Sequence, residues 1–537
     1  MVVKNSAAPR RLSRLLKNLS GNPAHCGATA ALFFALVALC QSAAWGQAAT
    51  ALPSTGPQGF RIQTSVSISE TYSDNVSLAG SGNVKSEWIT RIAPSVSLSQ
   101  TGPRLRFYGV YSPELLYRAI QGSQQVRHVL NATGNAELYK NLFFVDVRAN
   151  SVQQNVSLAN PLTDSNINTT GNRTTITTYG ISPYLRHDFG YDARGELRYT
   201  HDEVHFGSNS GSTSASTADS ISAQLTSGPA FQLFTWGLAY SKAHTEYAQS
   251  GQKIDAESFS LSGGRLIVPS VRLNATVGYE DTGYPTTTGS NQKGTFWSLG
   301  PTWAPTPNTR VSATIGRRYY GPSKSFHFDH RSRLTTWTVD YSESVTTTRG
   351  SFTVPVAADA AALDALLLSS IPDPVERQNR VRVLLASGLT FAQPVSFLTD
   401  NLFLEKRWQA TVGLQGVRNT LLGSLYSSNR NAFSTGAGVA GDFSKSQNVT
   451  QTGATVAWNS RLSQRLTANA SLGLTRNEFV TTNSSTRLSS LRFGLTQQFS
   501  PRLNGALLLS RIKSDTNIAG STSYVENSIS ASLGIGF

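Results

Sequence analysis

The sequence predicts an all-β protein, a transmembrane antiparallel β-barrel of about 20–22 strands with a small helical insertion. Three observations lead to this prediction: a basic and apolar leader, a period of two along most of the chain, and a last strand that ends in an aromatic residue. Composition agrees, because only 39% of residues are hydrophobic and 14% are charged, below the about 45–50% and 25% of globular domains. A barrel explains both deficits, since its lumen takes small polar residues.

The N-terminal residues have the layout of a cleaved signal peptide. Residues 4–17 are basic, and the apolar stretch 27–40 is too short to span a bilayer as a helix. Ala44 and Gly46 fit the small-x-small pattern that precedes a cleavage site, and cleavage after Ala48 fits almost as well. We therefore expect export through the general secretory pathway.

The domain organisation follows from this leader. We expect a signal peptide over 1–46, a periplasmic linker over 47–58 and an outer-membrane barrel over 59–537. Both cysteines, Cys26 and Cys40, lie in the leader. The mature chain therefore has neither a disulfide nor a thiol that could bind a metal or act as a nucleophile.

Apolar and small polar residues alternate from residue 59 onward. Phe60, Ile62 and Ile68 share one face of the first candidate strand, and Arg61 and Ser65 lie on the other. The second face is too polar for the core of a sandwich but suits a wet lumen. Candidate strands run over about 10–14 residues, and a tilted membrane strand needs about 9–11.

The separators between strands are alternately short and long. The short ones lie at 100–103, 139–141, 268–270 and 500–501. The long ones are rich in Ser, Thr, Asn and Gly, and lie at 156–173, 207–220, 432–448 and 476–487. This alternation is typical of the periplasmic turns and extracellular loops of a bacterial barrel.

The C-terminal strand is the most specific feature. Leu533, Ile535 and Phe537 share one face, and Ser532, Gly534 and Gly536 lie on the other. Together with the leader, an amphipathic last strand that ends in Phe resembles the signal that the barrel-assembly machinery recognises.

The alternation fails in the stretch 346–401. Apolar residues there fall at helical spacing, which predicts a helical insertion over about 357–387. Its apolar positions include Leu363, Leu366, Leu367, Val381 and Leu384. The insertion is interpreted as a structured loop, with the alternatives that it plugs the lumen, caps a pore mouth or packs on a partner. About 21 strands can be counted, yet bacterial barrels have an even number, so we expect one more short strand near 388–393.

Three segments share an arginine near the start of a strand that follows a short turn. These arginines are Arg272, Arg310 and Arg465. The repeat is consistent with strands that begin at the periplasmic rim, and equally with chance similarity between alternating segments.

Motifs of enzymes and metal sites are weak. His201 and His205 flank an acidic pair, but on a strand they stand about 13 Å apart, at roughly 3.3 Å per residue. His327 and Asp329 lie in a segment expected to be an extracellular loop, with no assignable nucleophile. No serine elbow or phosphate-binding loop occurs. We expect no catalytic, cofactor or metal site, and the protein is predicted not to be an enzyme.

The net charge of +15 is spread along the chain rather than gathered in blocks. Scattered charges argue against nucleic acid as a partner. The predicted partners are outer-membrane lipid and lipopolysaccharide, the barrel-assembly machinery, and an extracellular polysaccharide.

Several short motifs resemble the outer-membrane protein family associated with the PEP-CTERM exosortase system. They are TYSDNV at 71–76, WITRIAPSVSL at 88–98, WTVDYSE at 337–343, EKRW at 405–408 and Arg418-Asn419. The resemblance covers most of the mature chain. It implies a barrel of the cell outer membrane that serves exopolysaccharide production and biofilm, as an export channel or accessory protein. The alternative is a non-conducting surface scaffold or adhesin that uses its extracellular loops.

Overall fold

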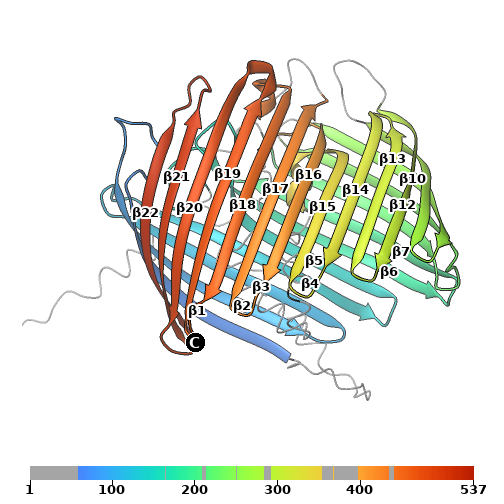
Figure 1. Cartoon of the computed structure of the whole chain (residues 1–537), viewed down its shortest axis with the longest axis horizontal. Coiled ribbons are helices and arrows are strands. Elements are labelled where there is room, and N and C mark those ends of the chain that lie inside the picture. The colour runs from blue at the N-terminus through green and yellow to red at the C-terminus, as the bar shows by residue number, and fades with distance from the viewer. Residues whose placement is uncertain are drawn as a thin grey trace, which may run out of the picture. The chain divides into compact units, whose positions relative to one another are not determined.

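The computed structural model describes residues 59–163, 165–208, 213–248, 251–283, 292–353, 367, 397–433 and 441–537. They form a single 22-stranded antiparallel sheet that closes on itself, because each strand pairs with the next and β22 pairs with β1 (Figure 1). This confirms the predicted all-β barrel. The expected leader with Ala44 and Gly46, and the linker over 47–58, lie outside the described residues.

The first half of the barrel consists of β1 (Gly59–Ser73), β2 (Glu87–Thr101), β3 (Leu105–Arg118), β4 (Gln124–Tyr139), β5 (Phe143–Asn155), β6 (Arg173–Phe189), β7 (Ala193–Phe206), β8 (Ser216–Ser227), β9 (Phe234–Tyr247), β10 (Lys253–Val268) and β11 (Val271–Gly283). The second half consists of β12 (Lys293–Thr306), β13 (Thr309–Arg318), β14 (Gly321–Arg331), β15 (Thr335–Thr346), β16 (Phe403–Gln415), β17 (Asn419–Ala432), β18 (Asn448–Arg461), β19 (Leu466–Phe479), β20 (Ser484–Gln498), β21 (Leu503–Thr516) and β22 (Tyr524–Gly536). Short helical turns occur at α3 (Thr348–Thr353), η1 (Gly441–Ser444) and η2 (Val480–Thr482). No helix among the described residues is long and apolar enough to cross a membrane.

The two faces of each strand differ as the alternation predicts. On β1, Phe60, Ile62 and Ile68 point outward and are 50–57% exposed. Ser69 and Ser73 point into the lumen, where they are buried. Successive side chains of a strand point to opposite faces, so the same alternation gives the barrel an apolar outer surface and a polar lumen wall.

The two ends of the barrel are unlike each other. At one end the strands are joined by short turns, such as 102–104 and 269–270, and both Gly59 and Phe537 lie at this short-turn end. The opposite, long-loop end carries connections such as 156–172 and 347–402. In Figure 1 the C terminus lies at the lower end of the barrel. Short turns are periplasmic in bacterial barrels, which assigns the short-turn end to the periplasm.

The seam between the first and last strands closes the barrel. The pairing runs from Ser65 opposite Gly536 to Ser73 opposite Ser528, and the Phe537 N–H donates to the Thr64 carbonyl at 2.9 Å. Leu533, Ile535 and Phe537 lie on the outer face and are 43–70% exposed. Closure leaves no unpaired edge along the shared length of the two strands.

The structure corrects three predictions from the sequence. Residues 326–330, expected in an extracellular loop, lie within β14. The segment 476–487 is not a long loop, because β19 and β20 extend through most of it and leave only 480–483. Likewise β8 begins inside the expected loop 207–220. Each of these segments is rich in polar residues that face water or the lumen from a strand. Its composition therefore resembles that of a loop.

The expected extra strand near 388–393 lies outside the described residues. The extra strand is not needed to give an even number. The described residues already form 22 strands, and residues 326–330, which were expected in a loop, lie in one of them, β14. Of the predicted helical insertion over 357–387, only Leu367 is described: it is helical and 1% exposed. Leu363, Leu366, Val381 and Leu384 lie outside the described residues.

Candidate functional site

The lumen wall is buried at the long-loop end and exposed at the short-turn end. Along β1, Arg61 and Ser65 are exposed, whereas Ser73 is fully buried. Along β3 the same change occurs from exposed Arg106 to Glu114, which is 7% exposed. Parts of the chain therefore fill the lumen beside the long-loop end of these strands.

The covering residues come from loops that fold inward instead of projecting outward. We call them the lumenal cap, defined as residues 156–163, 165–172, 397–402 and 441–447. The cap segments contact one another: the Leu398 N–H donates to the Val156 carbonyl at 3.0 Å, and the Leu158 N–H donates to Asp442 Oδ2 at 2.6 Å. A lumen of this strand number is wide enough to hold such a structure.

Side-chain amides hold the loop between β5 and β6 to two nearby strands of the wall, β22 and β3. Asn168 Nδ2 donates to Glu526 Oε1 on β22 at 2.8 Å, and the Ser73 hydroxyl donates to the same oxygen at 2.6 Å. Asn166 Nδ2 donates to Glu114 Oε2 on β3 at 2.9 Å. Hydrogen bonds to charged acceptors each contribute about 1.5–3 kcal/mol, so these contacts are strong anchors.

Guanidinium groups of the wall bind the backbone of the same segment. Arg118 Nη2 donates to the Ile167 carbonyl at 3.0 Å, and Arg127 Nη1 donates to the Asn166 carbonyl. Arg173 Nη1 donates to the Ser165 carbonyl. A loop exposes carbonyls that no strand partner satisfies, and arginine, with five donors, is suited to satisfy them.

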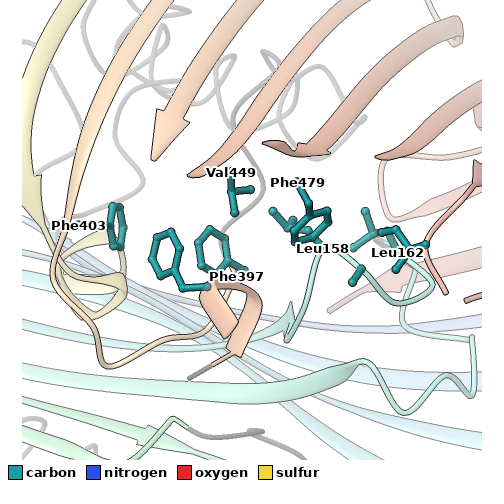
Figure 2. Close-up of a cluster of buried hydrophobic side chains, with 9 residues drawn as sticks. Leu158, Leu162, Phe397, Phe403, Val449 and Phe479 are labelled. Carbon is teal, nitrogen blue, oxygen red and sulfur yellow. The ribbon is translucent and has the colours of Figure 1, made fainter. Parts of the chain in front are cut away.

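An apolar core joins the cap to the wall (Figure 2). Its buried members are Leu158, Ala159, Leu162, Phe397, Phe403, Phe443, Val449, Phe479 and Ile518. The rings of Phe397 and Phe443 pack edge to face with centroids 5.0 Å apart. Arg430, on β17, lies over Phe397 with its guanidinium carbon 5.3 Å from the ring centre. This core packs cap residues against wall residues and so contributes to holding the cap in the lumen.

Two carboxyl groups are buried inside this assembly. Asp442 is 1% exposed and accepts hydrogen bonds from the Ser157 hydroxyl and the Leu158 N–H. Burial raises the pKa of the Asp442 carboxyl above its usual range, although both hydrogen bonds act in the opposite direction. Burial likewise raises the pKa of Asp400, which accepts bonds from the Ser214 hydroxyl and N–H.

The start of the long connection between β15 and β16 is also tied to the wall. On α3, Arg349 Nη2 donates to the Asp202 carbonyl of β7 at 2.9 Å, and its Nε donates to the Ser216 hydroxyl of β8 at 3.0 Å. The Thr348 hydroxyl donates to the Phe397 carbonyl at 3.0 Å, which joins the two ends of this connection. The residues predicted to plug the lumen belong to this connection between β15 and β16. The described ends of the connection lie inside the barrel.

The wall below the cap carries a network of arginines, acids and rings over β5–β7. Arg198 stacks on Tyr184, with its guanidinium carbon 3.8 Å from the ring centre, and pairs with Asp146 at 2.6 Å. Arg186 pairs with Glu196 at 2.8 Å. Each of these charges is balanced by a partner, so this part of the wall is polar and close to neutral.

His327 faces the lumen between two carboxylates. Its Nδ1 lies 2.6 Å from Asp340 and its Nε2 lies 3.2 Å from Asp329. Ser312 stands opposite His327 across the β13–β14 pair. A serine nucleophile needs a base nitrogen that points toward it, and here Asp329 already occupies Nε2. The arrangement lacks the contact that hydrolysis would require.

His201 and His205 lie on the outer face of β7, not in the lumen. Both contact Glu203, at 3.4 and 3.0 Å, and His201 Nδ1 also contacts Asp219 at 2.8 Å. Among the described residues no group of three or more His, Cys, Asp or Glu side chains could hold a metal ion. These charges form part of a polar outer surface above the apolar band.

The sequence predicted the long loops at 156–173 and 432–448 but missed that parts of them fold inward. The signal that was available is the apolar content of the loop 156–172, where Leu158, Leu162 and Ile167 interrupt a polar stretch. An exposed loop has no need of such residues. Wall residues such as Glu526 and Glu114 hold the cap, but the sequence around them contains no pattern that predicts this role.

A closed, even-numbered antiparallel barrel with an apolar outer face, a polar lumen and short turns at one end is an outer-membrane β-barrel. No family model matches the chain, and no curated protein of similar sequence was found. The fold of the chain is similar to those of several solved receptors. The siderophore receptor PirA from Acinetobacter baumannii shares 8% identity, with a TM-score of 0.44 over 90% of this chain and 81% of the receptor.

Two further solved structures are similar to the same degree. The ferric-catecholate import receptor Fiu from E. coli K12 has 9% identity and a TM-score of 0.45 over 88% of this chain and 81% of the receptor. The ferric preacinetobactin receptor BauA from Acinetobacter baumannii has 10% identity and a TM-score of 0.46 over 88% and 80%. Similarity at this level does not indicate what this barrel binds.

Proposed function

We propose that this outer-membrane barrel is an export channel, or an accessory protein of one, in an exopolysaccharide-linked envelope system of the PEP-CTERM type. The observation that carries the proposal is the lumenal cap, which is held to the wall by discrete polar contacts such as Asn168 to Glu526. Below the cap the lumen wall is polar and exposed to water. A docked cap above a hydrated lumen wall is the arrangement expected of a gated channel.

The chemistry of the wall supports a hydroxyl-rich cargo. Ser, Thr, Asn and Gly line the inner face, with paired arginines and carboxylates among them. Such groups exchange hydrogen bonds with a sugar chain without a deep pocket that would hold it in place. A passage for a polymer must bind weakly at many positions, and this wall offers many equivalent weak contacts.

The second candidate is a non-conducting surface scaffold. The buried apolar core favours it, because Phe397, Phe403 and Phe443 give the cap a packed interior that a permanently closed barrel would also have. In that case the outer parts of the loops would contact matrix components, and the lumen would have no transport role.

The remaining partners are proposed from the outer surface. The amphipathic last strand, with Leu533, Ile535 and Phe537 on its outer face, is suited to the barrel-assembly machinery. The charged outer surface near His201 and Glu203 lies at the level where lipopolysaccharide headgroups would contact a barrel.

Single-channel conductance of the refolded mature protein separates the two functions. The recording is made in a planar bilayer, with and without the exopolysaccharide of the host, on the wild type and on a variant that lacks residues 357–387. A conductance that the polymer blocks supports an export channel. Barrels that are silent in both forms, while still folded by heat-modifiable migration, contradict it and favour the scaffold.

A further inference from the structure

The short-turn end of the barrel carries arginines that have no acidic partners. Along β8–β22 and β1–β3, within five residues of a short turn or of the chain ends, the only acidic side chain is Asp329. We call the unpaired arginines of this sector the arginine rim. They are Arg61, Arg104, Arg106, Arg265, Arg272, Arg310, Arg331, Arg418, Arg461, Arg465 and Arg502. No ion pair involves any of them within the described residues.

The remaining sector of the same end has the opposite character. Near the short turns of β4–β7 lie Glu137, Asp146, Asp188, Asp192 and Glu196, and the arginines there are neutralised. Arg194, for example, pairs with Asp188 at 2.5 Å. The contrast shows that the arginine rim is a local concentration of charge, and not a general property of the short-turn end.

Several rim arginines face the lumen and not the lipid. Arg61 shares its face of β1 with Ser73, which binds Glu526 inside the barrel. Arg106 shares its face of β3 with Glu114, which binds the lumenal cap. Both arginines are exposed. Arg461, also exposed, lies on the inner face of β18, and its contact with the Val417 carbonyl at 2.8 Å leaves its charge unneutralised.

On the lipid-facing surface of the short-turn end, the rim has no comparable group of arginines. Among rim residues on strands, Arg265 shares the outer face of β10 with Phe259 and Leu261. A headgroup site for membrane lipid would require arginines mainly on that outer face. The rim instead places its strand-borne charges around the lumen opening, where they meet a solute that approaches from the periplasm.

We propose that the lumen-facing arginines of the rim, which include Arg61, Arg106 and Arg461 but not Arg265, bind an acidic polysaccharide at the periplasmic opening of the barrel. The guanidinium group stays charged at all physiological pH values and binds carboxylates through two parallel hydrogen bonds. A ring of such groups attracts a chain with repeated carboxylates and aligns it with the opening, since unscreened charges of one sign steer an opposite polymer. This inference rests on the proposed channel function for the direction of transport, but not for the binding itself.

The test uses polygalacturonate as an acidic probe and dextran as a neutral one. Binding of each polymer to the refolded full barrel in detergent micelles is measured by isothermal titration calorimetry at several salt concentrations. We expect polygalacturonate to bind, with an affinity that falls steeply as salt rises, and dextran to bind at least tenfold more weakly. Equal binding of the two polymers would overturn the proposal.

Substitutions locate the binding site. The triple variant R61Q/R106Q/R461Q removes three charges from the inner face, and R265Q removes one from the outer face as a matched control. We expect the triple variant to bind polygalacturonate at least tenfold more weakly, with a shallower salt dependence, and R265Q to bind as the wild type does. Heat-modifiable migration verifies folding, and single variants replace the triple variant if it fails to fold. Unchanged binding by the folded inner-face variants overturns the proposal.

A lipid site would give a different result. Vesicles containing phosphatidylglycerol would then compete with polygalacturonate, and R265Q would weaken binding more than the inner-face variant. The result of this binding experiment can also be separated from the result of the conductance experiment that tests the channel. A barrel that conducts but does not bind polygalacturonate overturns the arginine rim alone, whereas a silent barrel that binds it overturns the channel alone.

Discussion

Asn168, in the loop between β5 and β6, donates a hydrogen bond to Glu526 on β22 across 358 positions of the sequence. The bond is 2.8 Å long and lies inside the lumen, where both side chains are at most 2% exposed. It joins a loop to a wall strand that is far away in the sequence, and it is one of the polar contacts between the lumenal cap and the wall.

Loss of this bond should loosen the cap while the strands of the barrel wall stay paired. N168A removes one donor from the buried Glu526 carboxylate, at a cost of about 1–3 kcal/mol. Hydrogen exchange of the segment 156–172 should then accelerate roughly 5- to 150-fold, while exchange in β22 stays unchanged.

The matched control removes a similar bond from the outer face. The Thr90 hydroxyl donates to Glu70 Oε2 at 2.7 Å there, and T90V should leave exchange in 156–172 as it is in the wild type. An N168A protein with wild-type exchange in that segment would show that Asn168 does not hold the cap.

The apolar core should account for a larger part of cap stability. F443A removes a ring that is 2% exposed and packs against Phe397 and Phe403. Truncation of a buried phenylalanine costs about 3–5 kcal/mol. We expect trypsin to cleave within the cap of F443A and not of the wild type.

Phe493 provides the control for that experiment. It is 41% exposed on the outer face of β20, so F493A should leave the cap resistant to trypsin. Equal resistance of F443A and the wild type would indicate that the core is not needed for docking.

Docking of the cap should strengthen as the pH falls. Burial raises the pKa of Asp442 above the ordinary value of 3.8 in the docked cap, so the docked state binds the proton more tightly than the undocked state. The extra stability is complete below pH 3.8 and is lost as the pH rises through the raised pKa. Hydrogen exchange in 156–163 should accordingly slow at pH 4 relative to pH 7.5, after correction for intrinsic rates.

The variant D442N tests the origin of this pH dependence. The asparagine amide mimics the protonated acid, because its oxygen can accept from the Leu158 N–H and its nitrogen can donate to the Ser157 hydroxyl. We expect docking of D442N to vary less with pH than docking of the wild type. A pH dependence as large in D442N as in the wild type would assign the effect to another group, with Asp400 as the next to test.

The last strand should determine how much barrel assembles. Phe537 is 70% exposed on the outer face and its N–H closes the seam to Thr64. F537S keeps the backbone bond but removes the aromatic ring, so a loss of assembled protein would reflect recognition of the ring. In cells we expect several-fold less heat-modifiable barrel for F537S, and no loss for F499S, which changes a similarly exposed ring in a periplasmic turn.

Local pattern was sufficient to predict the wall of this barrel. The alternation of Phe60, Ile62 and Ile68 with polar residues fixes which face meets lipid, since a strand has a strict period of two. Residues 326–330 obey the same rule, because Phe326 and Phe328 alternate with His327 and Asp329, yet the polar residues of this segment led to the prediction of a loop. A strand with a polar inner face and few apolar residues has the composition of a loop.

The candidate site was not predictable in the same way. Its contacts join residues far apart in the sequence, such as Ser157 with Asp442 and Asn166 with Glu114. Nothing in the sequence near Glu114 or Glu526 distinguishes these lumen-facing acids from others. The predicted helical residue Leu367 is buried, as a plug would require, but the residues around it lie outside the described part of the chain.

The most direct test of the account is the conductance of a barrel whose cap can be locked. The described part of the chain contains no cysteine, and the Thr169 N–H donates to the Val76 carbonyl at 2.9 Å. The variant V76C/T169C in an N168A background should form a disulfide, because hydrogen-bonded backbones bring the two Cα atoms within bonding range. We predict no channel openings under oxidising conditions and frequent openings after reduction. Openings that are equally frequent in both states, or absent in both from a folded barrel, would contradict the proposal that the lumenal cap gates this barrel.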